Sequence, residues 1–243
     1  MITFLELGNY GRLGNQLFQI ASTIGIATKN DHSYSFSKWE YSKYFLNELP
    51  QVIMHSGFPY GIEEIKETSP YYKDIKLGEN YLWYDLKGYF QSWKYFDHCK
   101  ELIKYYFTPN FSTPPTKGTA GIHVRRGDYL YLQHTHPVLT MDYYNRAIDY
   151  FDPERYSFLV FSDDVTWCKE NFIGNKFSFS EEKDEVKDLF LLSSCEHQII
   201  ANSSFSWWGA WLNESPNKVV IAPKNYVIGE DHSDRIPPEW ITI

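Results

Sequence analysis

Cysteine is scarce in this sequence, and long apolar runs are missing. The three cysteines, Cys99, Cys168 and Cys195, show no CxxC spacing, so neither a disulfide framework nor a cysteine zinc site is predicted. No window approaches the roughly 18 apolar residues of a membrane span, and the first residues lack the basic start and apolar core of a signal peptide. We therefore expect a cytoplasmic protein without an integral membrane span, for which peripheral contact with a membrane stays open.

Positively charged residues are also fewer than negatively charged ones. The chain has 23 Lys and Arg against 31 Asp and Glu, a formal net charge of -8. Proteins that bind nucleic acids gain affinity from a basic surface that releases counterions, so we expect no nucleic-acid partner and only a local site for any phosphate group. Aromatic residues, in contrast, form 19% of the chain. Their rings suit sugar faces as well as protein cores, and composition alone does not separate these uses.

The second half of the chain has a regular pattern. From residue 119 onward, short apolar strands alternate with amphipathic helices, which predicts a Rossmann-like parallel sheet covered on both faces. The expected strands are 119–124, 157–161, 176–179, 198–201 and 218–222, and the expected helices are 141–151, 165–171, 183–194 and 204–212.

The first half has a weaker pattern. A strand at 2–7 and a helix at 15–28 flank a glycine-rich turn, and aromatic-rich segments then lead to a helix that ends near Phe107. Residues 108–117 contain three prolines among polar residues and are the best candidate for a linker. We therefore expect two domains, 1–112 and 113–243.

The stretch 121–129 (GIHVRRGDY) reads as a buried strand that runs into a charged turn. Alternate side chains of a strand share a face, so His123 and Arg125 point one way while the apolar residues between them face a core. An arginine fork matches the oxygens of a diphosphate, and Arg126 is expected to pair with a carboxylate that holds the loop. A purely structural arginine pair is the alternative, and composition does not exclude it.

Polar clusters follow two other strands of the expected sheet. They are 162–164 (SDD) and 202–206 (NSSFS), and the topology brings them to the edge where ligands bind in such sheets. Serine hydroxyls and amides at a helix start can bind phosphate, and a carboxylate can accept two hydrogen bonds from a guanine edge. Helix capping by the aspartates or the serines is the competing interpretation of each cluster.

A glycine-rich turn, 8–14 (GNYGRLG), precedes the first helix. Free backbone amides at a helix start can bind an anion. The pattern is neither a GxGxxG fingerprint nor a Walker P-loop, and a tight turn that requires positive φ at its glycines is an alternative explanation.

Three stretches, in order and spacing over nearly the whole chain, resemble the alpha-1,2-fucosyltransferases of glycosyltransferase family 11. They are 11–19 (GRLGNQLFQ), 123–129 (HVRRGDY) and 202–211 (NSSFSWWGAW). The resemblance implies an α/β protein with a GT-B-like fold, in which two Rossmann-like halves face a cleft. It also implies that domain 113–243 binds GDP-fucose and that domain 1–112 lies on the acceptor side.

The resemblance implies roles for single residues as well. It places Arg125 on the diphosphate, and it assigns His123 and either Asp163 or Asp164 to the guanine base or the ribose. The further donor-binding residues that it implies are Gly11, Arg12, Gly14, Asn15, Arg126, Asn202, Ser203, Ser204 and Phe205. No divalent metal and no other cofactor is expected.

The implied reaction inverts the anomeric carbon, so that GDP-fucose gives an alpha-1,2 fucoside, with the terminal galactose of a glycan as the expected acceptor. Arg125 and the amides at a helix start would stabilise the departing GDP. Asp128 is the nearest candidate for a general base, although it could instead hold Arg126. Other candidates are His134, His136 and Glu6. Two alternatives stay open: a transferase with another linkage or another sugar nucleotide, and a sugar-binding module without catalysis.

Overall fold

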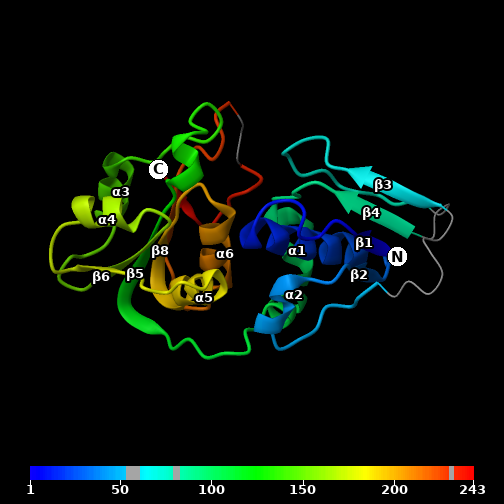
Figure 1. Cartoon of the computed structure of the whole chain (residues 1–243), viewed down its shortest axis with the longest axis horizontal. Coiled ribbons are helices and arrows are strands. Elements are labelled where there is room, and N and C mark those ends of the chain that lie inside the picture. The colour runs from blue at the N-terminus through cyan, green and yellow to red at the C-terminus, as the bar shows by residue number, and fades with distance from the viewer. Residues whose placement is uncertain (53–60, 79–82, 230–232) are drawn as a thin grey trace. The chain divides into compact units, whose positions relative to one another are not determined.

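The computed structural model describes residues 1–52, 61–78, 83–229 and 233–243. The chain divides into two compact units, Met1–Phe111 and Ser112–Ile243. Each unit has a parallel β-sheet of its own with helices packed against it (Figure 1).

The first unit is built on a four-stranded sheet in the order β2-β1-β4-β3, with all neighbours parallel. Its strands are β1 (Ile2–Phe4), β2 (Tyr34–Phe36), β3 (Ile62–Lys66) and β4 (Trp83–Lys87). Its helices are α1 (Leu13–Lys29) and α2 (Lys100–Tyr106), with short 3-10 helices η1 (Glu40–Tyr44), η2 (Trp93–Tyr95) and η3 (Asp97–Cys99).

Helix α1 is buried along most of its length, because apolar and small residues occupy nearly every position. Gly25 lets another segment come close, since a Cβ at this position would lie 2.1 Å from the main-chain oxygen of Tyr95. The helix predicted at 15–28 is confirmed, and it extends from Leu13 to Lys29.

The strand predicted at 2–7 is shorter than expected. β1 ends at Phe4, and the next amide, that of Leu5, donates to the buried Asp85 carboxylate at 2.8 Å instead of to a neighbouring strand. The sequence pattern did not predict β2, β3 or β4. The edge strand β3 exposes Glu63, Glu64 and other polar residues, so no apolar alternation marks it.

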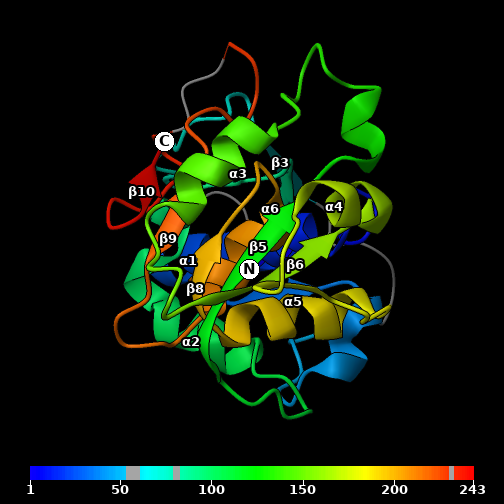
Figure 2. The ribbon, with the colours of Figure 1, turned by 90° about the vertical axis from the view of Figure 1, so that its left-hand side faces the viewer.

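The second unit is built on a six-stranded sheet in the order β10-β9-β8-β5-β6-β7, again with all neighbours parallel (Figure 2). Its strands are β5 (Thr116–Val124), β6 (Ser157–Ser162), β7 (Phe177–Phe179), β8 (Cys195–Ile199), β9 (Val220–Ala222) and β10 (Ile241–Thr242). Its helices are α3 (Met141–Ile148), α4 (Val165–Asn171), α5 (Glu185–Ser194) and α6 (Ser204–Leu212), with the 3-10 turn η4 (Gly127–Leu130).

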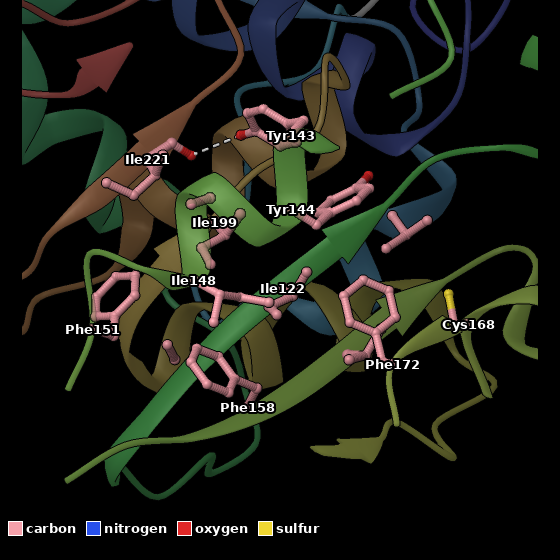
Figure 3. Close-up of a cluster of buried hydrophobic side chains, with 14 residues drawn as sticks. Ile122, Tyr143, Tyr144, Ile148, Phe151, Phe158, Cys168, Phe172, Ile199 and Ile221 are labelled. Carbon is pink, nitrogen blue, oxygen red and sulfur yellow. Dashed lines mark hydrogen bonds between the residues drawn. The ribbon is translucent and has the colours of Figure 1, made fainter. Parts of the chain in front are cut away.

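Different helices cover the two faces of this sheet. On one face, Ile122 of β5 belongs to an apolar cluster with Tyr144 and Ile148 of α3 (Figure 3). On the other face, Leu192 of α5 lies so close to β5 that a Cβ on Gly121 would be 2.6 Å from Leu192 Cδ1. The prediction of a parallel sheet covered on both faces is confirmed.

The alternation of strands and helices predicted after residue 119 is also confirmed, and α4 and α6 have the predicted bounds. Strand β10 was not predicted, because two exposed residues give no periodic signal. All three cysteines are free; Cys168 and Cys195 are buried and Cys99 is half-buried. Within the described ranges, no helix combines the length and the apolar character needed to cross a membrane.

Candidate functional site

Three polar strand ends of the second unit meet at the carboxyl edge of its sheet. Strand β5 lies between β8 and β6, so the residues that follow these strands are neighbours. The Arg126 amide, after β5, donates to Asp163 Oδ1, after β6, at 2.9 Å. The Tyr129 hydroxyl donates to the main-chain oxygen of Asn202, after β8, at 3.0 Å. The structure therefore brings the three predicted clusters together at the edge where ligands bind in parallel sheets.

Two carboxylates hold Arg125. Its Nη2 lies 2.6 Å from Asp128 Oδ1, and its Nη1 lies 2.8 Å from Asp163 Oδ2. The guanidinium also lies 5.3 Å from the centre of the Tyr129 ring. The Asp128 side chain is 53% exposed and that of Asp163 is 26% exposed. Because ion pairs are weaker the more water surrounds them, Asp128 is the more weakly bound of the two partners of Arg125.

Arg126 is fixed in a different way. Its Nε lies 3.1 Å from Asp164 Oδ2, and its guanidinium stacks 4.1 Å from the centre of the Trp167 ring. Asp164 Oδ1 accepts from the Trp167 amide at 3.1 Å and so caps α4, as the capping interpretation predicted. Arg126 is therefore paired with a loop-holding carboxylate, as expected. The suggestion that Asp128 holds Arg126 is wrong, because the turn η4 places Asp128 beside Arg125.

Asp163, which follows β6, bonds to both arginines that follow β5. One oxygen accepts from the Arg126 amide while the other pairs with Arg125. Gly127 makes this possible, since a Cβ at this position would lie 2.5 Å from Asp163 Oδ2. The glycine of the motif thus allows the carboxylate to come close to the loop.

His123 is buried on the same face as α5 and α6. Its ring centre lies 5.1 Å from that of Phe205, the second residue of α6. Burial, together with the nearby charge of Arg125, lowers the pKa of His123 to about 3, so the ring is neutral near pH 7. Its Nδ1 is buried and has no hydrogen-bond partner among the described residues. A buried polar atom of this kind is a place where a ligand can complete the hydrogen bonding.

Asn202 and Ser203 lead into α6. The Asn202 amide donates to the main-chain oxygens of Pro137 and Tyr226 at 3.0 and 3.1 Å, so it braces two loops. Ser203 is the N-cap residue of α6, but its side chain makes no capping hydrogen bond. The capping interpretation is therefore wrong for Ser203, and its hydroxyl is not used to satisfy the helix. Ser204 is the first residue of α6.

The predicted residues of the first unit lie at the start of α1. Gly11 has a φ of +73°, and a Cβ there would lie 2.0 Å from Asn15 Nδ2, so this turn requires glycine. Arg12 is the exposed N-cap residue of α1 and makes no side-chain cap, while Gly14 is buried. The side-chain oxygen of Asn15, Oδ1, accepts from Gln91 Nε2 at 2.7 Å.

Other features of the described residues lie away from these clusters. No group of three or more His, Cys, Asp or Glu side chains in that part of the chain is placed to hold a metal ion. A pocket of about 310 Å³ in the first unit is lined by part of β3, by most of the segment 67–78 and by Tyr84, Phe90 and Tyr95. None of the predicted site residues lines it. The predicted sites are strand and helix ends, not this pocket.

A family model described as Glycosyl transferase family 11 matches residues 62–243. The chain belongs to glycosyltransferase family 11. The match includes the whole second unit and therefore the arginine and serine clusters described above.

Curated glycosyltransferases resemble this family 11 chain over different shares of their length. The O-antigen biosynthesis glycosyltransferase WbnK of Escherichia coli is 39% identical over 51% of this chain and 44% of its own. The alpha-1,2-colitosyltransferase of Escherichia coli is 29% identical over 96% of both chains. The galactoside alpha-(1,2)-fucosyltransferase 1 of Bos taurus is 26% identical over 83% of this chain and 64% of its own. The chain thus spans less than two thirds of the first and third of these relatives.

A solved structure of the NodZ alpha-1,6-fucosyltransferase soaked with GDP-fucose has a TM-score of 0.53 and 13% identity, covering 91% of this chain and 92% of the other. At this identity the likeness shows the fold alone. The family 11 chain therefore has the GT-B-like α/β architecture, with two parallel-sheet units, that the sequence predicted.

Sequence reasoning missed Arg235 of this family 11 chain. Its main-chain oxygen accepts from Trp207 Nε1 of α6 at 2.8 Å. Burial raises the pKa of Tyr129, and the positive charges of Arg125 and Arg235 oppose this rise, so Arg235 brings a further cation near the motif loop. The segment around Arg235 has no helical or strand periodicity, and a lone arginine after the last long helix gives no signal in the sequence.

Proposed function

We propose that this family 11 glycosyltransferase transfers L-fucose from GDP-fucose to a hydroxyl of a glycan, with inversion and formation of an alpha-1,2 linkage. The observation that carries the proposal is Arg125, held at the end of β5 by an exposed carboxylate and a more buried one. A pre-positioned guanidinium stabilises the charge that develops on a departing diphosphate without further reorganisation. The names of the curated relatives and of the structural neighbour support a deoxysugar donor.

The donor site is proposed to use the second unit. Arg125 binds the diphosphate, assisted by the Ser203 hydroxyl and the first amides of α6, because a helix start attracts anions. His123 and Phe205 lie beside each other and are proposed to contact the nucleotide base. In the first unit, the amino end of α1, with Arg12 as an exposed cation, is proposed to assist at the fucosyl diphosphate.

Asp163 or Asp164 could contact the guanine base only by giving up a hydrogen bond that it already makes. Both oxygens of Asp163 and both oxygens of Asp164 already accept from arginine groups or from a backbone amide. A guanine edge would have to replace one of these hydrogen bonds. We propose that Asp163 and Asp164 mainly orient the two arginines of the motif. Either aspartate would contact the guanine base only after the bound donor has replaced one of its present hydrogen bonds.

Asp128 is proposed as the general base. It is the exposed partner of Arg125, and a diphosphate that takes over the guanidinium would release its carboxylate. The freed carboxylate would then be available to remove the proton of an acceptor hydroxyl. The first unit is proposed to bind the acceptor, and galactose is the proposed terminal sugar because a relative is named a galactoside transferase.

One rival donor is supported by a specific observation. A relative that aligns over 96% of both chains is named a colitosyltransferase, so transfer of colitose from a nucleotide donor is the second candidate function. The same arginine and helix start would serve either donor, since both act on the diphosphate.

Calorimetry tests the proposal directly. We expect GDP-fucose and GDP to bind the wild type in the presence of chelator, and Arg125→Ala to weaken binding by about a hundredfold, as loss of a charge-assisted contact of roughly 3 kcal/mol implies. Arg146→Ala is the matched control, because among the described residues Arg146 forms an ion pair with Asp142, and both side chains are exposed on α3. Absence of GDP binding by folded wild-type protein would refute the donor assignment, and tighter binding of a GDP-colitose donor would favour the rival.

A further inference from the structure

The turn that follows β4 contains a strained residue. Phe90 has a φ of +49°, in the left-handed region that side chains with a Cβ rarely adopt, and it is only 1% exposed. The preceding Gly88 also has a positive φ, of +146°. Backbone strain of this kind persists only where surrounding contacts over-determine it, and it is often found at binding sites.

Several contacts within the first unit fix this turn. Glu67 accepts from the amides of Tyr89 and Phe90 at 2.7 and 2.9 Å, one with each carboxylate oxygen. Gly88 is needed for this approach, since a Cβ there would lie 2.4 Å from Glu67 Cβ. From α1, Ser22 Oγ donates to the main-chain oxygen of Phe90 at 2.9 Å. The turn is therefore held both from the residue that follows β3 and from α1.

The braced turn presents Tyr89 to solvent. The Tyr89 side chain is 45% exposed, and its ring stands edge-on to that of Tyr10, with 6.4 Å between the centres. The Tyr10 hydroxyl is hydrogen-bonded to the Glu6 carboxylate, which raises the pKa of Tyr10. Glu6 in turn pairs with Lys87 Nζ at 2.7 Å. Two aromatic rings and an ion pair thus lie together at the carboxyl end of β1 and β4.

The charges around Lys87 limit what can bind here. Besides Glu6, the carboxylates of Glu64 and Asp85 lie 3.3 and 3.7 Å from Lys87 Nζ. Three carboxylates around one ammonium disfavour an anionic ligand, and a purely apolar ligand would remove water from these charged groups without offering them hydrogen bonds. A neutral sugar has the right chemistry, because its ring face packs on an aromatic plate and its hydroxyls donate to carboxylates.

We propose that Tyr89 and Tyr10, beside the Glu6–Lys87 ion pair, form a subsite for a neutral hexose unit of the acceptor glycan. The assignment of that hexose to an acceptor rests on the proposed transferase function. Binding of the sugar itself does not depend on that function. In this arrangement Glu67 is a positioning residue, because it holds the turn and does not reach the sugar.

The test uses the full-length protein and N-acetyllactosamine, a galactose-terminated disaccharide, as the probe. Saturation-transfer NMR without donor should show binding to the wild type and to Tyr89→Phe, which keeps the ring, and at least about a tenfold loss for Tyr89→Ala, equivalent to roughly 1.4 kcal/mol. Tyr105→Ala is the matched control, since Tyr105 is 55% exposed on α2 of the same unit. Glu67→Ala should reproduce the loss while Glu67→Gln, which keeps one acceptor oxygen, loses less.

A second readout separates this inference from the proposed function. In transfer assays Tyr89→Ala should raise the KM for the disaccharide about tenfold, the same 1.4 kcal/mol, while calorimetry shows an unchanged Kd for GDP-fucose. Equal binding of the disaccharide by wild type and Tyr89→Ala, or no binding by either, would overturn the subsite. Failure of GDP-fucose to bind would refute the transferase while the NMR comparison still decides the subsite.

Discussion

At the scale of single residues, the two arginines at the proposed donor edge of the second unit already have carboxylate partners. Arg125 has Asp128 and Asp163 as partners, and Arg126 has Asp164. A protein with a net charge of -8 can therefore keep two adjacent guanidinium groups in place without a bound anion. Donor binding is expected to be an exchange of one anion for another, and the exchange should occur at the most exposed partner.

Asp128→Asn separates the two roles of this carboxylate. Without its charge, residue 128 no longer competes with GDP for the Arg125 guanidinium. An exposed ion pair contributes up to roughly 1 kcal/mol, so we expect GDP to bind up to about fivefold more tightly. Loss of a general base should lower kcat by about a hundred- to ten-thousand-fold. Calorimetry and steady-state kinetics on the same preparation measure both effects. Unchanged kcat would assign the base elsewhere, and Asp142→Asn on α3 serves as the control.

His123 should make stability depend on pH. Its pKa in the folded protein, about 3, lies below the unfolded value of 6.5, so the unfolded chain binds a proton first as the pH falls. Stability is then full above pH 6.5 and decreases by about 1.4 kcal/mol for each pH unit below it, down to pH 3.

Urea unfolding between pH 7.5 and 5 measures this dependence. For His123→Gln, the slope of unfolding free energy against pH should be smaller than the wild-type slope by the equivalent of about one proton. Equal slopes for wild type and His123→Gln would show that His123 is not buried in neutral form. His197, whose pKa burial also lowers, should account for part of the remaining slope.

At the scale of elements, one leucine joins a strand and two helices. Leu192 of α5 lies between Gly121 of β5 and Gly209 of α6, and a Cβ on either glycine would be 2.6 Å from one of its methyl groups. The side chain cannot move away from one glycine without approaching the other. This packing is what brings α5 and α6 onto the face of the sheet that carries His123.

Gly209→Ala should therefore destabilise the protein, although alanine is the better helix former. The gain of up to about 1 kcal/mol in helix propensity offsets only part of the roughly 1–3 kcal/mol that overpacking costs, so we expect a net loss of up to about 2 kcal/mol in unfolding free energy. Denaturant titration measures it. In combination with Leu192→Ala the glycine substitution should cost nothing or even stabilise, and strictly additive effects would contradict the packing argument.

The sequence predicted elements and site residues to different degrees, for physical reasons. Apolar strands alternating with helices in the second unit follow from burial on both faces, so β5, α4 and α6 were predicted well. Strand β3 was missed, because an exposed edge strand carries charged residues. The pairing of Asp128 with Arg125 depends on the 3-10 turn between them, and sequence spacing does not specify such a turn.

At the scale of the whole molecule, we propose that arginines of the second unit are the main counterions for the donor diphosphate. The described residues offer no cluster of three metal-ligating side chains, and Arg125, Arg126 and Arg235 lie near one sheet edge. We expect transfer and GDP binding to change less than about twofold, or roughly 0.4 kcal/mol, when EDTA replaces magnesium. Loss of activity in EDTA that returns with a divalent cation would contradict this expectation.

The strand order of the second sheet also has a consequence for biosynthesis. The central strand β5 pairs with β8, whose residues Cys195–Ile199 are made long after residues 116–124 have left the ribosome. Until then one edge of an apolar strand is unpaired, and parallel pairings between distant segments form slowly. Nascent chains should therefore depend on chaperones and on slow translation, and the yield of native protein should rise when cells are grown at low temperature.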